Sequence, residues 1–327
     1  PRHAVTAELP FDRARTSMAR FALCADCARE YADPADRRHH AQLISCPACG
    51  PRLAFATLDG PVLADGPEAL DACVAALRDG AIVAVKGVGG FLLVCDATRA
   101  DVVLALRARK QRPMKPLAVL VHDLATAARH CVVRDAEAMA LLSPVAPIVL
   151  CPLRADGALP RGALAPGLDA LGLMLPASPL LWLLSRAMGC PLVATSANVS
   201  GSPTLHREDD VRELLADVAD AMLFDDRPIL VPADDSVLRI TPAARATILL
   251  RRGRGLAPAP CEERLVAAMS PTILALGAHM KAAFTLGGDG IAWQSQYLGD
   301  LESAESELAF ERTLAHVRGV THAAPRI

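Results

Sequence analysis

Residues 108–121 read ARKQRPMKPLAVLV, and this stretch decides the expected fold. Pro113 and Pro116 prevent a helix from continuing through it, because proline lacks the backbone N–H and its ring clashes with the preceding turn. The apolar run after Pro116 is typical of a buried strand. We therefore expect an irregular loop that leads the chain into the interior of an α/β domain.

Three cations, Lys110, Arg112 and Lys115, lie on this expected loop with no acidic residue between them. In an extended loop, Lys110 and Arg112 would point the same way because they are two residues apart. Such a cluster suits a polyanionic ligand, for example a nucleoside triphosphate. The alternative is a basic surface loop without a ligand.

The composition favours a globular protein of two or three domains. The chain has 327 residues, of which 52% are apolar, so sizeable buried cores are expected. A net charge of −2 argues against a general binder of nucleic acid or of membrane surfaces. Aromatic residues make up 3%, too few for base-stacking platforms, and we do not expect binding of double-stranded RNA.

The compartment that these features favour is a reducing cytoplasm. No apolar run has membrane-spanning length, and the first residues contain no secretory apolar core. The sequence also lacks an initiator methionine, which suggests a mature or excised piece of a longer chain. Ten cysteines fit one metal site rather than a disulfide framework, because six of them stand singly in apolar surroundings. These six are Cys73, Cys95, Cys131, Cys151, Cys190 and Cys261.

The other four cysteines form two C-x-x-C pairs and predict a zinc module over residues 1–60. The pairs are separated by eighteen residues, and each pair offers two thiolates to one tetrahedral ion. The predicted ligands are Cys24, Cys27, Cys46 and Cys49. A redox dithiol is the alternative. His39 and His40 are expected to be surface residues rather than ligands, and the zinc to be structural, because no open coordination position is apparent.

Residues 65–260 alternate between helical and strand patterns and predict an α/β domain. Two short buried strands are expected around the Gly-rich turn in residues 81–97, and a hairpin in residues 234–254. Expected helices cover residues 67–80, 101–109, 136–142, 179–189 and 210–224, the fourth capped at Ser178-Pro179.

A small polar loop follows the buried strand CPLVA and is a candidate ligand site. Its hydroxyls, amide and backbone N–H groups suit phosphate or ribose, and an ordinary turn is the alternative. The polar residues are Thr195, Ser196, Asn198, Ser200 and Gly201. Arg251, Arg252 and Arg254 further on are either an anion clamp or a solvated edge.

The order of these motifs resembles the YrdC family of carbamoyl-adenylate-forming domains. The motifs are KGVGGFLLVCDA, RKQRPMKPLAVLV, TSANVSG, DDS and RRGRG. KGVGGF and LGLMLPASPL resemble the version found in the HypF family of carbamoyltransferases, which mature nickel–iron hydrogenase. The cysteine segment is similar to the second zinc-finger-like repeat of that family. One departure is Leu92, where the related sequences have histidine.

Residues 270–327 resemble the beginning of the actin-like carbamoyl-transfer domain of the same family. The resemblance implies two strands, TILALG and AAFTLGG, with Lys281 near nucleotide phosphate and residues 296–300 on the next strand. An amphipathic helix is expected over ESELAFERTLAHV. The family's metal-binding histidine motif is absent, and His279, His316 and His322 are expected to be ordinary polar residues.

The resemblance implies a YrdC-like twisted mixed sheet with surrounding helices and a basic cleft. It also implies that ATP, with Mg²⁺, reacts with carbamoyl phosphate or carbamate to give carbamoyl-adenylate. The acceptor of the carbamoyl group is then the C-terminal cysteine of the HypE protein. The implied catalytic residues are Lys110, Arg112 and Ser196, and the implied substrate-binding residues are Lys86, Lys115, Thr195, Asn198, Ser236 and Arg254.

Two other functions remain open from the sequence. One is threonylcarbamoyl-adenylate synthesis for tRNA modification, which the zinc repeat and the actin-like segment disfavour. The other is a zinc-dependent RNA- or protein-binding module, whose signature would be a steep salt dependence of binding.

Overall fold

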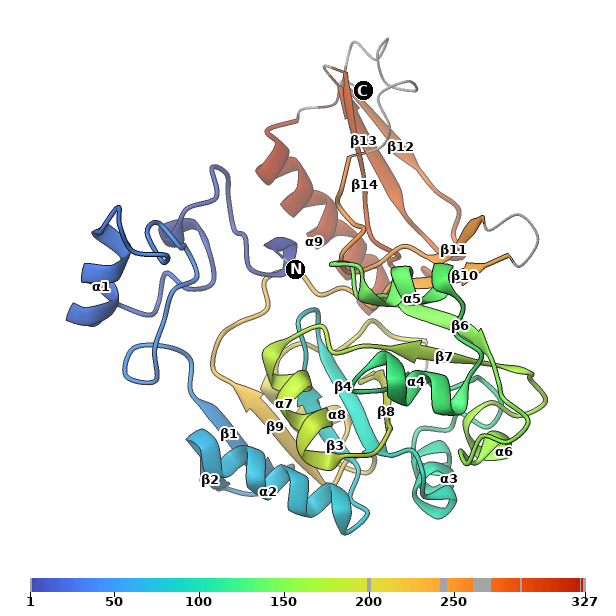
Figure 1. Cartoon of the computed structure of the whole chain (residues 1–327). Helices are drawn as coiled ribbons and strands as arrows, with labels where there is room; N and C mark the ends of the chain where they lie inside the picture. The colour runs from blue at the N-terminus through green and yellow to red at the C-terminus, as the bar shows by residue number, and fades with distance from the viewer. Residues whose placement is uncertain are drawn as a thin grey trace.

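The structure is a computed structural model that describes residues 2–198, 201–241, 246–260, 272–288, 290–323 and 325. Ser200 and Cys261 of the sequence predictions lie outside these residues. Figure 1 shows a small N-terminal part around α1 (Ala25–Ala32), a large sheet flanked by helices, and a second sheet packed beside α9 (Ala304–Thr321).

The large sheet has eleven strands among the described residues, in the order β11-β10-β6-β7-β5-β8-β4-β3-β9-β1-β2. Parallel and antiparallel neighbours alternate irregularly, so the predicted mixed α/β sheet is confirmed. The strands are β1 (Leu53–Thr57), β2 (Val62–Asp65), β3 (Val83–Lys86), β4 (Phe91–Asp96), β5 (Val119–Leu120), β6 (Ile148–Pro152), β7 (Ala170–Met174), β8 (Leu192–Ser196), β9 (Ala221–Asp225), β10 (Val237–Ile240) and β11 (Thr247–Arg251).

The centre of the sheet is buried on both faces. Strand β4 pairs with β3 and β8, and its successive side chains point to opposite faces. Leu93 and Cys95 join one apolar core, which contains Leu106 of α3 (Ala100–Arg109), whereas Val94 joins the other, which contains Leu184 of α7 (Pro179–Met188). Helices on both sides explain why the strands are continuously apolar rather than alternating.

Helices cover these two faces, and most lie where the sequence predicts them. α7 begins after Ser178, whose hydroxyl accepts the backbone N–H of Leu181, and ends at Gly189 in the left-handed conformation. The helices of this part are α2 (Gly66–Arg78), α3 (Ala100–Arg109), α4 (Leu124–His130), α5 (Asp135–Leu142), α6 (Arg161–Leu164), α7 (Pro179–Met188) and α8 (Glu208–Leu214).

The prediction of one helix over residues 210–224 is wrong. α8 ends at Leu214, and residues 221–225 form β9 between β3 and β1. The run Ala221–Leu223 is buried inside the sheet. Burial between two strands therefore overrides the helical pattern, which is a common outcome for short apolar runs.

The basic stretch forms the irregular loop that its prolines predict. Lys110 caps α3 with helical backbone angles, and Gln111 follows at φ +51°. The loop is therefore not extended between Lys110 and Arg112, so the condition under which their side chains would point the same way is not met. The strand after the loop is short, because only Val119 and Leu120 pair with neighbours.

Arg107 on α3 holds this loop in shape. Its buried guanidinium donates hydrogen bonds to the carbonyl oxygens of Arg112, Pro113 and Lys115 at 2.8–3.1 Å. It also donates to the carbonyl oxygens of Ala163 and Leu164 in the neighbouring α6. A loop without regular structure thus has its buried carbonyl groups paired.

The N-terminal part contains two short helices and α1. Its short helices are η1 (Arg2–Ala4) and η2 (Arg13–Arg15). The Arg13 guanidinium donates to the carbonyl oxygens of Phe21, Gln42 and Ile44, which ties the two halves of this part together.

The C-terminal part is a three-stranded antiparallel sheet of β12 (Ile273–Leu276), β13 (Phe284–Gly288) and β14 (Ile291–Gln294), with a small core of its own against α9. The two predicted strands and the helix are confirmed. The expectation that residues 296–300 lie on the next strand is wrong, because β14 ends at Gln294. After it, the chain turns to contact the large part, where Tyr297 N–H donates to the carbonyl oxygen of Arg252 at 2.6 Å.

None of the helices described is both long enough and apolar enough to cross a membrane.

Arg107→Met should destabilise the protein by about 3 kcal/mol, because several buried carbonyl groups lose their donors. Arg109→Met is the matched control: Arg109 is two residues along the same helix and pairs with Asp220 at the surface. That exposed pair is worth about 0–1 kcal/mol. Urea unfolding followed by circular dichroism measures both. Equal losses in the two variants would contradict the role given to Arg107.

Candidate functional site

A cavity of about 210 Å³ opens between the Gly-rich turn and the ends of β8 and β11. One wall is backbone of the turn, Gly87–Gly90, and another is apolar, with Leu92 and Met174. Its polar side chains are the hydroxyls of Thr195, Ser196 and Thr204, the guanidinium groups of Arg112, Arg251 and Arg254, and the carboxylates of Asp234 and Asp235. Leu92 therefore places an aliphatic side chain where the resemblance leads one to expect histidine.

Two glycines let the backbone close tightly beside this cavity. A Cβ at Gly89 would lie 2.2 Å from the carbonyl oxygen of Ala233, and one at Gly253 would lie 2.1 Å from that of Asp234. Both distances are too short for any side chain. The turn after β3 and the turn after β11 are therefore both packed against the segment 233–234.

A second cavity, of about 270 Å³, adjoins the first. The two share Arg112, Ser196, Asp234 and Arg251 in their walls. Lys115, Asn198 and Gly201 line only the second cavity, whose far wall comes from the C-terminal part and includes Tyr297 and Asp300. Together the cavities offer room for a nucleotide-sized ligand.

Arg112 is a cation that lacks a complete set of partners. It donates from Nη2 to the carbonyl oxygen of Pro116 at 2.9 Å, while its Nε is buried without a hydrogen-bond partner. Burial lowers the pKa of Arg112, nearby Arg107 and Arg251 lower it further, and Asp234 opposes this. An anion in the cavity would relieve both the missing hydrogen bond and the repulsion.

Asp234 is the carboxylate at the centre of these cations. It lies 3.6 Å from the Arg251 guanidinium and lines both cavities. The sequence shows it within the DDS motif, but its closeness to the basic loop depends on the sheet order. The basic loop has no acidic residue of its own, but the fold brings Asp234 close to it from a segment more than a hundred residues later in the sequence.

Lys110 is almost fully buried and faces the polar loop rather than the open cavities. Its ammonium donates to the carbonyl oxygens of Ser196 and Asn198 at 2.7 and 2.9 Å, and to Oδ1 of Asn198 at 2.8 Å. Burial lowers its pKa to about 7, with Arg112 adding to the shift and Asp234 opposing it. Its predicted role in holding a triphosphate stays a prediction.

The polar loop is held together by the same residues. Ser196 Oγ donates to Oδ1 of Asn198 at 3.0 Å, and Asn198 Nδ2 donates to the carbonyl oxygen of Ser202 at 2.7 Å. Thr195 and Ser196 line the first cavity with Arg112, and Ser196 and Asn198 line the second with Arg112 and Lys115. Which part of a ligand each one touches stays a prediction.

Three of the predicted binding residues, Lys86, Ser236 and Arg254, form hydrogen bonds with other groups of the protein. Lys86 donates to the Glu208 carboxylate and to the carbonyl oxygens of Asp225 and Arg227, and it lines neither cavity. Ser236 is fully buried and bonds Gly253 N–H and the carbonyl oxygen of Arg254 at 3.0 Å.

Arg254 reaches the wall of the first cavity, but its guanidinium binds Asp235 and the carbonyl oxygens of Val145 and Ala146. These contacts support the cavity wall. Of the other predicted clamp residues, Arg251 faces both cavities, and Arg252 donates to the carbonyl oxygen of Ala259.

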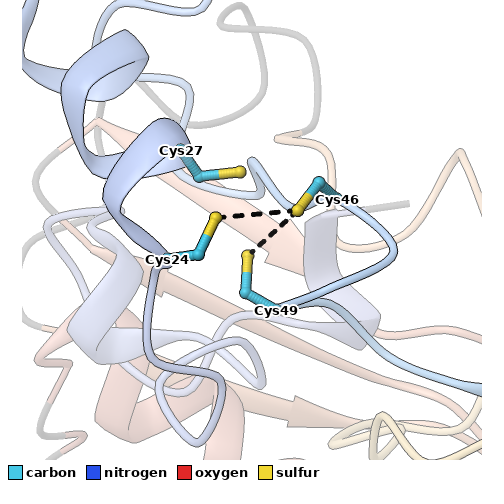
Figure 2. A group of neighbouring side chains, drawn as sticks. All are labelled: Cys24, Cys27, Cys46 and Cys49. Carbon is cyan, nitrogen blue, oxygen red and sulfur yellow. Dashed lines mark hydrogen bonds between the residues drawn. The ribbon is translucent and has the colours of Figure 1, made fainter.

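Four thiols gather in the N-terminal part, as Figure 2 shows, two from α1 and its cap and two from the loop before β1. All four sulfur atoms lie within 4.8 Å of one another, and Cys46 lies 3.7 Å from Cys24 and 3.8 Å from Cys49. Tetrahedral zinc with bonds of about 2.3 Å places its sulfurs about 3.8 Å apart. The predicted ligand set therefore fits a structural zinc ion.

The protonation of these thiols agrees with a cation site. Backbone hydrogen bonds lower the pKa of Cys49 to about 6, whereas burial raises that of Cys27 to about 12. A cation bound among the four sulfurs would favour the thiolate form of each. His39 and His40 are exposed and contact each other edge to face, and neither belongs to the group of four thiols.

Comparison with known proteins identifies the class. The Sua5/YciO/YrdC family model, described as "telomere recombination", matches residues 75–253, which is more than half of the chain. The chain therefore belongs to the Sua5/YciO/YrdC family. Models of the HypF finger and of the HypF Kae1-like domain match residues 23–56 and 268–327 on either side.

The particular relatives that share all three segments are HypF carbamoyltransferases. The chain is 47% identical over 310 residues to carbamoyltransferase HypF of Rhodobacter capsulatus, covering 95% of this chain and 40% of that protein. The HypF structure of T. kodakarensis superposes with a TM-score of 0.91 at 36% identity, over 97% of this chain and 41% of that one.

A full-length HypF in a phosphate- and nucleotide-bound form superposes with a TM-score of 0.89 at 35% identity, over 98% of this chain and 41% of that one. The chain thus spans about two fifths of the length of the HypF relatives that it matches. The three-segment order predicted from the sequence is confirmed, while the limits at residues 1–60, 65–260 and 270–327 stay predictions.

Cys46→Ser should lower the zinc content by about one ion per chain at the same free zinc, because a four-thiolate site loses one ligand. Elemental analysis after dialysis measures the ratio. Cys190→Ser is the control, since Cys190 stands outside the group. A zinc content that is unchanged by Cys46→Ser would refute the four-cysteine site.

Anion binding should be accompanied by proton uptake at Lys110. Its lowered pKa means that stability rises with pH from about 7 to the ordinary lysine pKa, because the unfolded chain holds the proton more tightly there. A bound anion raises that pKa, so anion binding takes up part of a proton above about pH 7. Calorimetry in two buffers of different ionisation enthalpy measures the uptake.

Lys110→Met should abolish this uptake, whereas Lys115→Met should retain it, because Lys115 is exposed on the same loop. Uptake that persists in Lys110→Met would assign the proton to another group.

Proposed function

We propose that the chain activates a carbamoyl group with ATP, as its similarity to HypF carbamoyltransferases suggests. An oxygen of carbamate attacks the α-phosphorus of ATP, forming carbamoyl-adenylate, and the bond to pyrophosphate breaks. When carbamoyl phosphate is the source, water first cleaves it to carbamate and phosphate. The observation that carries the proposal is the paired cavity with Arg112, Arg251 and Ser196 in both halves.

The chemistry needs positioning and charge neutralisation more than a nucleophile. Pyrophosphate leaves with increased negative charge, and Arg112 and Arg251 are fixed cations on the cavity walls. The Gly87–Gly90 turn offers backbone close to the ligand, and Ser196 and Asn198 offer hydroxyl and amide groups. No cysteine or histidine lines either cavity among the described residues, which agrees with direct attack by the substrate.

The cofactors in this proposal are a structural zinc ion at the four cysteines and the Mg²⁺ that accompanies ATP. Mg²⁺ prefers carboxylate and phosphate oxygens, and Asp234 is the carboxylate that both cavities share. When bound, Mg²⁺ neutralises part of the phosphate charge.

The proposed acceptor is the C-terminal cysteine of a HypE protein. Its thiolate attacks the carbamoyl carbon, a C–S bond forms, and AMP leaves with the bonding electrons. Because the chain spans about two fifths of its HypF relatives, the adenylation half is the step that we assign to it.

Threonylcarbamoyl-adenylate synthesis is the second candidate, since the matching family model is not specific to HypF. The HypF finger and the Kae1-like segment on either side favour the carbamoyl reaction. A module that binds RNA through its basic cleft is disfavoured by the net charge of −2 and by Asp234 at the centre of the cations.

Pyrophosphate release from ATP should require carbamoyl phosphate or carbamate, and should not occur with threonine and bicarbonate. Arg112→Ala should lower kcat/KM about 10²–10³-fold, because a fixed cation at the leaving group is lost. Ser196→Ala should lower it about tenfold, since one hydrogen bond to a charged ligand is lost.

Arg154→Ala is the control, because Arg154 pairs with Asp156 at the surface and lines neither cavity. Release that depends on threonine would assign the chain to tRNA modification. ATP binding without release for any donor would show that the cavity binds nucleotide but that the proposed reaction is wrong.

A further inference from the structure

His3 lies where three distant segments of the chain meet. It belongs to η1, and Ala4 beside it is buried and accepts the backbone N–H of Leu230 at 2.8 Å. The imidazole of His3 packs against His316 of α9. The first residues of the chain are thus held between the large sheet and the C-terminal helix, as Figure 1 shows by the position of the N-terminus near α9.

Both imidazoles have a ring nitrogen that no described residue binds. Nε2 of His3 and Nε2 of His316 are buried and lack hydrogen-bond partners. The ring centroids lie 5.2 Å apart with an interplanar angle of 65°. Burial lowers the pKa of both rings, that of His3 to about 4, so both are neutral near pH 7 and their lone pairs are available.

Gln296 adds a third buried atom without a partner. Its side chain is almost fully buried, and Nε2 donates to the carbonyl oxygen of Pro232 at 3.2 Å. This bond fixes the orientation of the amide, so that Oε1 faces His3 closely enough to raise its pKa, but without the geometry of a good hydrogen bond. Three buried polar atoms without a well-formed hydrogen bond, on three side chains linked through His3, are rare in a folded interior, since each costs about 1–3 kcal/mol.

We propose that His3, His316 and Gln296 form a second metal site, which takes a divalent transition ion such as Zn²⁺ through two imidazole nitrogens and one amide oxygen. Two imidazoles that bind one tetrahedral ion at about 2.1 Å place their ring centroids roughly 5 Å apart. The observed separation of 5.2 Å meets this condition. Nitrogen and oxygen donors of this kind suit zinc and its neighbours rather than calcium or magnesium.

A cavity beside His3 has room for a water molecule, although neither His316 nor Gln296 lines it. His3 lines a cavity of about 340 Å³ whose other walls include Trp293 and Val317. The ligands come from η1, from the segment after β14 and from α9. The ion would therefore fasten the N-terminal segment to the C-terminal part, and its role is structural. This inference does not depend on the proposed adenylation.

The test is the zinc content of the untagged 327-residue chain after dialysis against excess Zn²⁺ and removal of free metal. We expect two ions per chain in the wild type and one in His3→Gln and in His316→Gln, which remove an imidazole but keep a polar side chain. His279→Gln is the control, because His279 is exposed on the C-terminal part, and it should keep two. Circular dichroism verifies that the variants fold.

Cobalt substitution separates the two sites. Thiolate-bound cobalt gives a sulfur-to-metal charge-transfer band, which the second site lacks, so His316→Gln should lose one cobalt ion without losing that band. One ion per chain in the wild type would overturn the proposal. So would a second ion that persists in both His3→Gln and His316→Gln, or an experimental structure of the zinc-saturated chain with only a water molecule between the three side chains.

Discussion

The buried guanidinium of Arg107 is the interaction on which the candidate site depends. Residues 111–118 have no regular structure, yet the loop must hold Arg112 at a cavity wall and then enter the sheet at Val119. Arg107 satisfies the carbonyl groups of that loop from one side. Because a guanidinium has five donors in a fixed plane, one side chain replaces the hydrogen bonds that a helix or strand would supply.

The site concentrates positive charge in a place where water has limited access. Lys110 binds carbonyl oxygens of the polar loop, Arg112 keeps an unpaired nitrogen, and Asp234 balances part of the charge. Such an arrangement destabilises the folded chain in the absence of a ligand, and a bound anion offsets that destabilisation. The same cations therefore stabilise the folded chain less than their hydrogen bonds suggest.

Local patterns in the sequence are sufficient for the hairpin of β3 and β4, for the Ser178 cap and for the four thiols, because each depends on neighbours in the chain. Local patterns fail where the structure of a segment depends on residues that are far away in the sequence. β9 is a strand because β1 and β3 flank it, and Lys86 and Ser236 are internal because of partners across the sheet. Asp234 beside Arg251, and Arg107 beneath the loop, also require the tertiary fold.

The bonds from Lys110 to the polar loop join residues 86 and 88 positions apart in the chain. Such long-range contacts close large loops, whose entropic cost slows folding. During synthesis, Asn198 and Arg251 emerge well after the basic loop, so the cations of that loop stay unorganised until then. An anion that needs both the basic loop and Arg251 therefore cannot bind, or stabilise the fold through that site, before residue 251 has been synthesised.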